Sequence, residues 1–324
     1  MPLVTFERVA AFADDLPAGA AGDASDLPTL EQRIVAAVAY RDMFQFAPDA
    51  AEITRYLPHL QSSEANVHAA LAGGRLVPEI LVTDGQYYAL KGREAFFALR
   101  RERREISRTL RAKAVRTAAR IASLPFVQMI ALTGSLAAEN PDPDADLDVI
   151  IVTDAGRLWR VNAVTSTLRF IDQHLGPRHF CPNVMRSKAA LEFENHRLYT
   201  AQEMAMMVPL FGYDTYLEIF DRNPWVHTYL PNCEPFEAPA DLVASPLAPG
   251  SRDLLEAVFD SAAGQQLERI WYDRRVRQHR DPDHRFHRYT PFTPEAQGLY
   301  VDMGEAIEGA LNSRLAQVGL PPLP

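Results

Sequence analysis

The stretch Ile130–Thr153, IALTGSLAAENPDPDADLDVIIVT, decides the fold expected for this chain. It contains two apolar runs, Ile130–Thr133 and Val149–Thr153, and the polar loop between them opens on Gly134-Ser135. Short β-branched runs bounded by Gly and by Pro-Asp clusters are typical of buried strands. We therefore predict two core strands joined by a Gly-Ser corner and an acidic loop.

Two aspartates stand where the second run begins. Because successive side chains of a strand point to opposite faces, Asp146 and Asp148 share one face and Leu147 points to the other. Two adjacent carboxylates repel each other, and a bound cation relieves the repulsion. Mg²⁺ (or Mn²⁺) takes such oxygen ligands together with substrate phosphates. Asp144 and Asp146 have the same spacing, but the later pair adjoins the strand and is preferred.

Gly134-Ser135 supplies the other half of the predicted site. Glycine allows the backbone to approach a ligand closely. A strand that ends in Gly-Ser and turns into a short helix presents N–H groups and the positive end of a helix dipole to an anion. The Ser135 hydroxyl adds one donor for a phosphate oxygen. Phosphate donors beside metal ligands are what nucleotidyl transfer requires.

The pattern Thr133-Gly134-Ser135, ten intervening residues, then Asp146-Leu147-Asp148-Val149 resembles the motif of the DNA polymerase beta-like nucleotidyltransferase superfamily. The resemblance implies an α/β (α+β) fold with a small mixed-sheet core. It also implies transfer of NMP from an NTP, with ATP as the first candidate, to a hydroxyl or phosphate acceptor. Asp146 and Asp148 would be the catalytic metal ligands, and Gly134 and Ser135 would bind the nucleotide. The structural alternative is an acidic turn, Pro141–Asp146, between two core strands.

A third predicted strand, Arg178–Ser187, departs from the superfamily pattern. The superfamily usually carries a third carboxylate on this strand, whereas the aligned residue here is Asn183. Asn183 remains a metal-site candidate, but a neutral amide cannot accept a proton. The nearest acids, Glu192 and Glu194, lie about ten residues further along. The general base and a second metal ion therefore stay open at this stage.

Composition and length favour a cytoplasmic protein with several domains. The chain has 324 residues and no apolar run near the ~20 residues that span a bilayer. Its first residues lack the pattern of a secretory signal, and no membrane partner is expected. The two cysteines, Cys181 and Cys233, do not form a disulfide framework. A structural role for Cys181 is favoured over a nucleophile activated by His179.

The sequence divides into five predicted segments. The resemblance to a winged helix-turn-helix rests on three helices followed by a hairpin at Thr83-Asp84-Gly85. The segments are a flexible lead-in at 1–28, a winged helix-turn-helix at 29–92, a basic connecting helix at 93–123, a nucleotidyltransferase core at 124–198 and a helical domain at 199–324.

Individual helix boundaries follow from capping residues and breakers. Thr29 is expected to cap the first helix, and Pro209 to stop a Met-rich helix at Thr200–Val208 whose methionines belong to the core. One long helix is expected over Asp253–His279, and the last helix over Thr293–Leu315.

Two features bear on nucleic-acid partners. The predicted recognition helix, Ser63–Leu71, has no Lys or Arg, so a docking or substrate-positioning role is favoured over DNA binding. Residues 91–120 carry eleven Lys or Arg against three Glu, a local charge of +8 within a chain of net charge −9. This helix is either a solvated connector or a cationic wall that attracts triphosphate or RNA.

Three functions are compatible with these residues. The first is an NTP-dependent, Mg²⁺-assisted nucleotidyltransferase whose acceptor is a small molecule, a protein or RNA. The second is a non-catalytic, nucleotide-sensing regulator that binds DNA through the winged helix, which the neutral Asn183 keeps open. The third is an RNA- or tRNA-end nucleotidyltransferase, which the basic helix supports.

Overall fold

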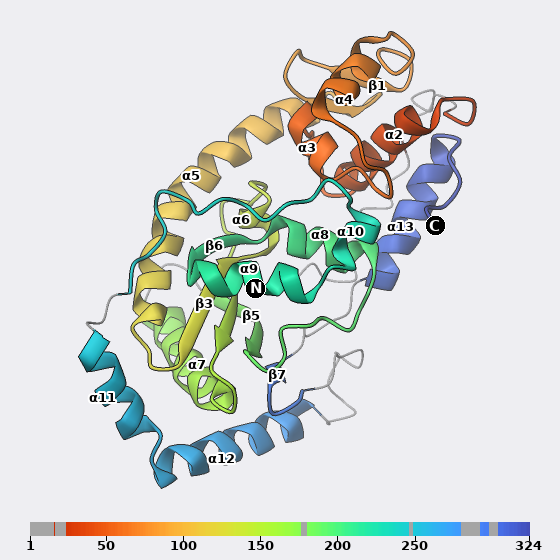
Figure 1. The fold of residues 1–324 in the computed structure, drawn as a ribbon. Helices are drawn as coiled ribbons and strands as arrows, with labels where there is room; N and C mark the ends of the chain where they lie inside the picture. The colour runs from red at the N-terminus through yellow and green to blue at the C-terminus, as the bar shows by residue number, and fades with distance from the viewer. Residues whose placement is uncertain (1–15, 17–23, 176–179, 246–248, 280–291, 298–303) are drawn as a thin grey trace.

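The computed structural model is a mixed α/β fold built on one central sheet (Figure 1). It describes residues 16, 24–175, 180–245, 249–279, 292–297 and 304–324. Most of the predicted lead-in at 1–28 lies outside the described residues. None of the described helices is both long and apolar enough to cross a membrane.

The elements follow one another in a simple order. In sequence, they are α2 Thr29–Asp42, α3 Ala50–Arg55, α4 Glu64–Ala72, β1 Leu81–Thr83, β2 Tyr88–Leu90, α5 Ala95–Ala122, β3 Val127–Leu132, α6 Gly134–Ala137, β4 Leu147–Thr153, α7 Leu158–Leu175, β5 Phe180–Ser187, α8 Leu198–Met206, β6 Val208–Phe211, α9 Tyr213–Arg222, α10 Val226–Tyr229, α11 Pro249–Phe259, α12 Ala262–His279, β7 Ala296–Gln297 and α13 Gly304–Gln317.

The main sheet has the strand order β6-β3-β4-β5-β7 within the described part of the chain. The pair β4·β5 is parallel, and the other pairs are antiparallel. The two strands predicted from Ile130–Thr153 are therefore neighbours at the centre of the sheet. Side-chain alternation along them gives each face its own core. One face carries Met129, Ala131, Ile150 and Val152, and the other carries Ile130, Leu132, Val149 and Ile151.

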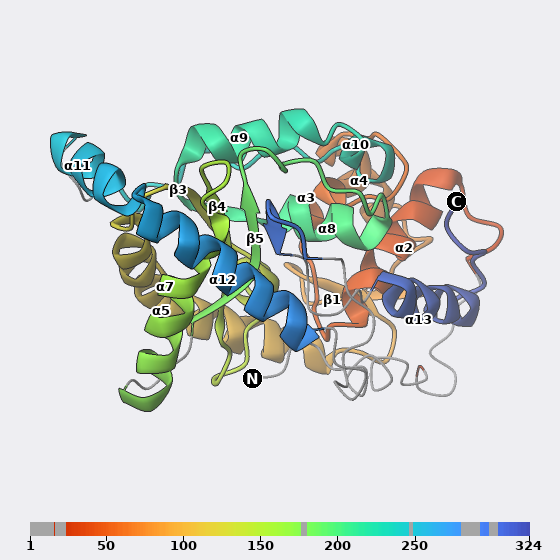
Figure 2. The same ribbon diagram turned by 90° about the horizontal axis from the view of Figure 1, so that it is seen from below.

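Different helices cover the two faces. Figure 2 shows α5, α7 and α12 on one side of the sheet and α8 and α9 on the other. Asp148 lies two residues before Ile150, so alternation along β4 places it on the face that α8 covers. This arrangement decides which distant residues can reach the aspartates.

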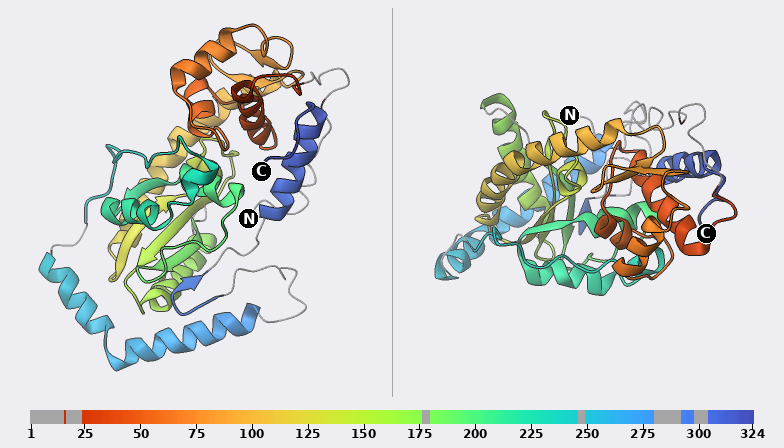
Figure 3. Two further views of the ribbon diagram at one scale, coloured as in Figure 1. Left: turned by 45° about the vertical axis from the view of Figure 1, so that its right-hand side comes forward. Right: turned by 90° about the horizontal axis from the view of Figure 1, so that it is seen from above.

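The first helices lie at one end of the molecule, beside the last helix (Figure 3). An ion pair between Arg314 Nη1 and Asp42 Oδ2, 2.9 Å long, joins α13 to α2, and both side chains are 2% exposed. Asp49 and Glu52 form a capping box at α3, and Ser63 caps α4. The sequence prediction for α2 was wrong in detail. Pro28 occupies its cap position, and no side chain caps the helix.

The part after residue 198 contains strands that the sequence reading missed. The Met-rich helix ends at Met206, and Val208–Phe211 forms the edge strand β6 instead of continuing as helix. Pro209 fits there because an edge strand needs no N–H on its outer side. Further along, Ala296–Gln297 pairs with Met185 and Arg186 of β5. The last helix therefore begins at Gly304 and not at Thr293.

The long helix predicted over Asp253–His279 is two helices, α11 and α12, which meet at an angle (Figure 3). The bend brings backbone close to backbone at Gly264. A Cβ at this position would lie 1.9 Å from the carbonyl oxygen of Phe259, so only glycine fits. The α11–α12 bend lets α12 run along α7.

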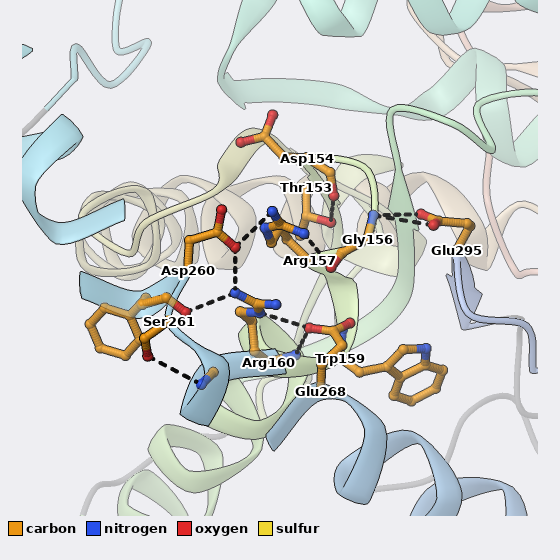
Figure 4. A network of polar contacts seen from close by, with 12 residues as sticks. Thr153, Asp154, Gly156, Arg157, Trp159, Arg160, Asp260, Ser261, Glu268 and Glu295 are labelled. Atoms are coloured by element: carbon orange, nitrogen blue, oxygen red, sulfur yellow. Dashed lines mark hydrogen bonds and ion pairs between the residues drawn. The ribbon is translucent and has the colours of Figure 1, made fainter. Parts of the chain in front are cut away.

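A polar network fastens α12 to the start of α7 (Figure 4). The Glu268 carboxylate accepts hydrogen bonds from the backbone N–H groups of Trp159 (2.6 Å) and Arg160 (2.8 Å). It also accepts one from Arg160 Nε at 3.0 Å, and Asp260 pairs with Arg157 and Arg160. Glu268 thus supplies the acceptors that the N-terminus of α7 lacks within its own helix.

We expect the Glu268→Ala substitution to lower the free energy of unfolding by about 2 kcal/mol, because it removes a helix cap and a bond to the buried Arg160. Urea denaturation followed by circular dichroism measures the change. Glu79→Ala, at an exposed position, is the matched control and should stay within about 0.5 kcal/mol of the parent. Equal stability of both variants would contradict the capping role.

Candidate functional site

The Gly-Ser corner and the second aspartate lie against each other. β3 ends at Leu132, and the N–H of Thr133 donates to the carbonyl oxygen of Asp148 at 3.0 Å. Gly134 then opens α6 with φ +64°, and a Cβ added there would lie 2.9 Å from Asp148 Oδ2. A side chain at Gly134 would therefore be strained and would push the carboxylate aside. The corner requires glycine for conformation and for space.

Asp146 and Asp148 act on each other electrostatically. β4 begins at Leu147, so Asp146 immediately precedes the strand and Asp148 is its second residue. Burial, followed by the negative charge of Asp146, raises the pKa of Asp148 to about 7. Asp144 is exposed, and none of its atoms is among those nearest to a Cβ at Gly134. Of the two possible pairs, Asp144/Asp146 and Asp146/Asp148, only the second therefore includes a carboxylate next to the glycine.

Cys181 on β5 lies beside Asp148 in the parallel register of β4 and β5. Its thiol hydrogen-bonds to the Asp148 carboxylate, which favours the ionised carboxylate. Burial, followed by the charge of Asp148, raises the pKa of Cys181 to about 12. The thiol therefore stays protonated near neutral pH, which supports the structural role over a nucleophile.

Asn183 lies at an irregularity of β5. The register with β4 shifts there: Val149 is paired with Pro182, Ile150 is paired with Val184, and Asn183 is left between them. The side chain is 9% exposed, and its Oδ1 has no hydrogen-bond partner among the described residues. A buried amide oxygen without a partner is uncommon and calls for a ligand or water. This oxygen is suited to a hydrogen-bond donor or a cation.

Ser135 is the second residue of α6 and is partly exposed. Its backbone carbonyl accepts a hydrogen bond from the N–H of Asn140 at 2.8 Å, which folds the following loop back onto the helix. Within the described residues its hydroxyl has no partner, so it is free to donate to a ligand.

The sequence reading missed a third acid, Glu203 on α8. Burial raises the pKa of Glu203 to about 7, Arg41 lowers it and the charge of Asp148 raises it further. The effect of Asp148 means that the two carboxyls are close enough to interact. Glu192 and Glu194, the acids considered from sequence, are both exposed. Only the packing of α8 on the sheet face that carries Asp148 reveals Glu203.

The arginines of α5 are mostly neutralised by ion pairs. Acidic residues from other segments pair with them: Arg100 with Glu52 and Glu139, Arg101 with Asp84, Arg103 with Asp142, Arg104 with Glu139 and Arg111 with Asp241. A positive and a negative charge at these distances largely cancel each other, so little positive electrostatic field is left to attract a distant anion. These pairs favour a structural connector over a cationic wall.

Comparison with known proteins gives no relative. No family model, no curated protein and no solved structure matches this chain. The site must therefore be interpreted from its own geometry and chemistry.

The arrangement fits a divalent cation of the magnesium type. In the described ranges, no group of three or more His, Cys, Asp or Glu side chains is arranged to hold a metal ion. Mg²⁺ commonly needs only one or two carboxylates and takes its remaining ligands from substrate phosphates and water. Asp146 and Asp148 offer two carboxylates, and the unpartnered Oδ1 of Asn183 is a further oxygen on the neighbouring strand.

Proposed function

We propose that this chain is a nucleotidyltransferase of the DNA polymerase beta-like type, which transfers NMP from an NTP to a hydroxyl or phosphate acceptor. An acceptor oxygen attacks the α-phosphate, the bond between the α- and β-phosphates breaks, and pyrophosphate leaves. The observation that carries the proposal is the contact of Gly134 with the carboxylate of Asp148, beside Asp146. In this proposal the corner would bind phosphate and the two aspartates would bind the metal ion, so the close approach supports a single site. ATP is the first NTP to test.

Each residue has a separate role in this proposal. Asp146 and Asp148 would hold Mg²⁺ or Mn²⁺, and Gly134 and Ser135 would bind the β- and γ-phosphates. The metal ion supplies positive charge that offsets the charge developing on the transferred phosphoryl group. The pKa of Asp148, raised to about 7, means that the carboxyl must lose its proton before it can serve as a ligand.

We assign to Glu203 the role of the third carboxylate of the superfamily, because β5 carries the neutral Asn183 at that position. Asn183 cannot accept a proton, whereas burial holds the pKa of Glu203 at about 7, near the value that suits a general base. Its electrostatic interaction with Asp148 supports a role near the proposed metal site. We therefore assign to Glu203 the removal of the proton from the acceptor hydroxyl.

We expect Glu203→Gln to lower the transfer rate by about 10²-fold or more, as general-base removal does. The rate should fall with little change in the affinity for NTP, because the role proposed for Glu203 concerns the acceptor hydroxyl and not the phosphates. Glu194→Gln, at an exposed position on the segment after β5, is the matched control and should leave the rate unchanged. Equal rates for the parent and Glu203→Gln would remove Glu203 from the mechanism.

The direct test uses the full chain, Mg²⁺, each α-³²P-labelled NTP in turn and a cell extract as the source of acceptors. Label that moves to any acceptor in the presence of Mg²⁺, and not in the presence of EDTA, supports the transferase. Sensitivity of the labelled product to ribonuclease or protease then identifies the class of acceptor. An RNA acceptor stays a prediction, although the ion pairs of α5 remove most of the charge that favoured it.

A nucleotide-sensing regulator remains the second candidate because of two observations. The third strand carries the neutral Asn183, and α4 exposes Asn66 and His68, which can read base edges. Electrophoretic mobility shifts with genomic fragments, with and without NTP, test this function. DNA binding that responds to NTP, without transfer of label, would favour the regulator over the enzyme.

A further inference from the structure

A cavity of about 410 Å³ lies beside α6 and apart from the aspartate pair. Its walls come from α2, α3, α5 and α6, from the ends of β3 and α8, from the start of β6, and from the loop that carries Phe236. None of Gly134, Asp146 and Asp148 lines it. The volume falls in the range of about 300–1,000 Å³ that is typical of small-molecule sites.

Aromatic rings and two arginines shape this cavity. The rings belong to Phe46, Tyr56 and Phe236. The guanidinium carbon of Arg41 lies 4.0 Å from the ring centroid of Tyr56, and that of Arg55 lies 4.0 Å from the centroid of Phe236. These cation–π contacts hold both guanidinium groups against rings that line the cavity.

Neither arginine has a carboxylate at ion-pair distance within the described part of the chain. Arg55 Nη2 donates to the carbonyl oxygen of Ala205 at 2.9 Å. Arg41 donates to Gln202 Oε1 at 3.1 Å and to Met206 Sδ at 3.0 Å. Arg41 is only 6% exposed, and the Nε atoms of both arginines are buried without a hydrogen-bond partner among the described residues. Positive charge held in this way is costly unless an anion compensates it.

The other charged groups around the cavity are already engaged. Arg108 pairs with Glu105, Arg111 pairs with Asp241 through two bonds of 2.7 Å, Glu52 and Glu139 pair with Arg100, and Asp49 caps α3. Glu52 and Glu203 act on Arg41 only from beyond ion-pair distance. Arg41 and Arg55 are thus the cations of the cavity that lack a carboxylate at ion-pair distance within the described residues.

We propose that this cavity binds a small organic anion, in which a planar apolar ring carries a phosphate or a carboxylate. The anionic group would bind to Arg41 and Arg55, whose guanidinium groups suit either oxyanion. The ring would lie among Phe46, Tyr56 and Phe236. The proposal does not depend on the transfer reaction, since the cavity shares no residue with the aspartate pair and its glycine.

Ligand-observed NMR titrations of the full chain test this proposal with three probes that share a phenyl ring: phenyl phosphate, benzoate and benzylamine. We expect at least one of the two anions to bind and benzylamine not to bind. The anion that binds with the higher affinity shows whether the cavity prefers a phosphate or a carboxylate. Arg55→Gln should weaken that anion about tenfold or more, the usual effect of losing a charge-assisted hydrogen bond. Arg116→Gln on α5, which removes the same charge away from the cavity, is the matched control.

A second variant separates binding from folding. Ala51→Phe on α3 keeps both arginines but fills the cavity from an exposed position, and it should also weaken the anion. Circular dichroism checks that each variant is folded. Unchanged affinity in folded Arg55→Gln, binding of benzylamine as tight as that of the anions, or no binding of either anion at millimolar concentration would overturn the proposal.

Discussion

Replacing Asp148 by Asn is expected to lower nucleotide transfer by about 10³-fold or more, since a metal-bound transition state is stabilised by several kcal/mol. The carboxylate lies against Gly134 and next to Asp146, and an amide cannot supply its charge. The measurement is the rate at which label passes from α-³²P-NTP to the acceptor. The thermal shift that Mg²⁺ and NTP together cause in the parent should also disappear.

The same substitution should stabilise the protein above neutral pH. Burial and Asp146 raise the pKa of Asp148 to about 7, well above the value near 4 of an unfolded Asp. Between these two values the folded state binds a proton that the unfolded state has lost, so stability falls as pH rises through this window. Asn has no carboxyl group that must lose a proton. At pH 8 the free energy of unfolding of Asp148→Asn should therefore exceed that of the parent by on the order of 1–2 kcal/mol, and at pH 4 the two should differ little.

Asp144→Asn is the matched control for both measurements. Asp144 is exposed in the loop before β4, and its position in the earlier Asp-x-Asp spacing makes it the direct competitor of Asp148. This variant should keep the parent rate and the parent stability at both pH values. If Asp144→Asn abolished transfer and Asp148→Asn did not, the pair of metal ligands would be the earlier one.

The second large effect is expected from Arg100, the buried arginine of α5. Its Nη2 lies 2.8 Å from Glu52 Oε1 and 3.3 Å from Glu139 Oε2, and its Nη1 donates to the carbonyl oxygen of Glu139 at 2.9 Å. The side chain is 2% exposed. Arg100→Met should lower the free energy of unfolding by about 3 kcal/mol, because it removes a buried charge and leaves the partly buried Glu52 without its charge partner.

Urea denaturation at pH 7 and pH 5 tests the role of Arg100. Burial raises the pKa of Glu52, and Arg100 opposes the rise, so Glu52 should protonate more readily in the variant. The loss of stability should therefore be smaller at pH 5 than at pH 7. The neighbouring exposed pair gives the control: Arg101→Met, opposite Asp84, should cost about 1 kcal/mol or less. Equal losses for the two variants would show that Arg100 contributes no more than a surface pair.

The centre of the fold could be predicted because its information is local. Two β-branched runs, a Gly-Ser corner and the Asp146-Leu147-Asp148 alternation lie within 24 consecutive residues, Ile130–Thr153. Strand periodicity alone orients the two aspartates, and a positive φ next to a carboxylate explains Gly134. The start of a helix at Ser63 could be predicted for the same reason.

What the sequence did not reveal depends on pairing between distant segments. Glu203 lies on a helix whose methionines indicate core, and only the sheet beneath α8 brings it to Asp148. Strands β6 and β7 have four and two residues, too short for a periodic pattern, and exist because β3 and β5 offer them an edge. The bend before α12 depends on the close approach of Gly264 to Phe259.

The ion pair between Asp42 and Arg314 has a practical consequence for producing shorter versions of this protein. It ties α2 to α13, across more than 270 positions of sequence. Truncation after residue 303 would uncover the buried carboxylate of Asp42 together with apolar neighbours such as Ile34 and Val38. A fragment of residues 29–92 also lacks α13, so Asp42 and the same apolar residues would be exposed to solvent. We therefore expect this fragment to be soluble only when it is co-expressed with α13.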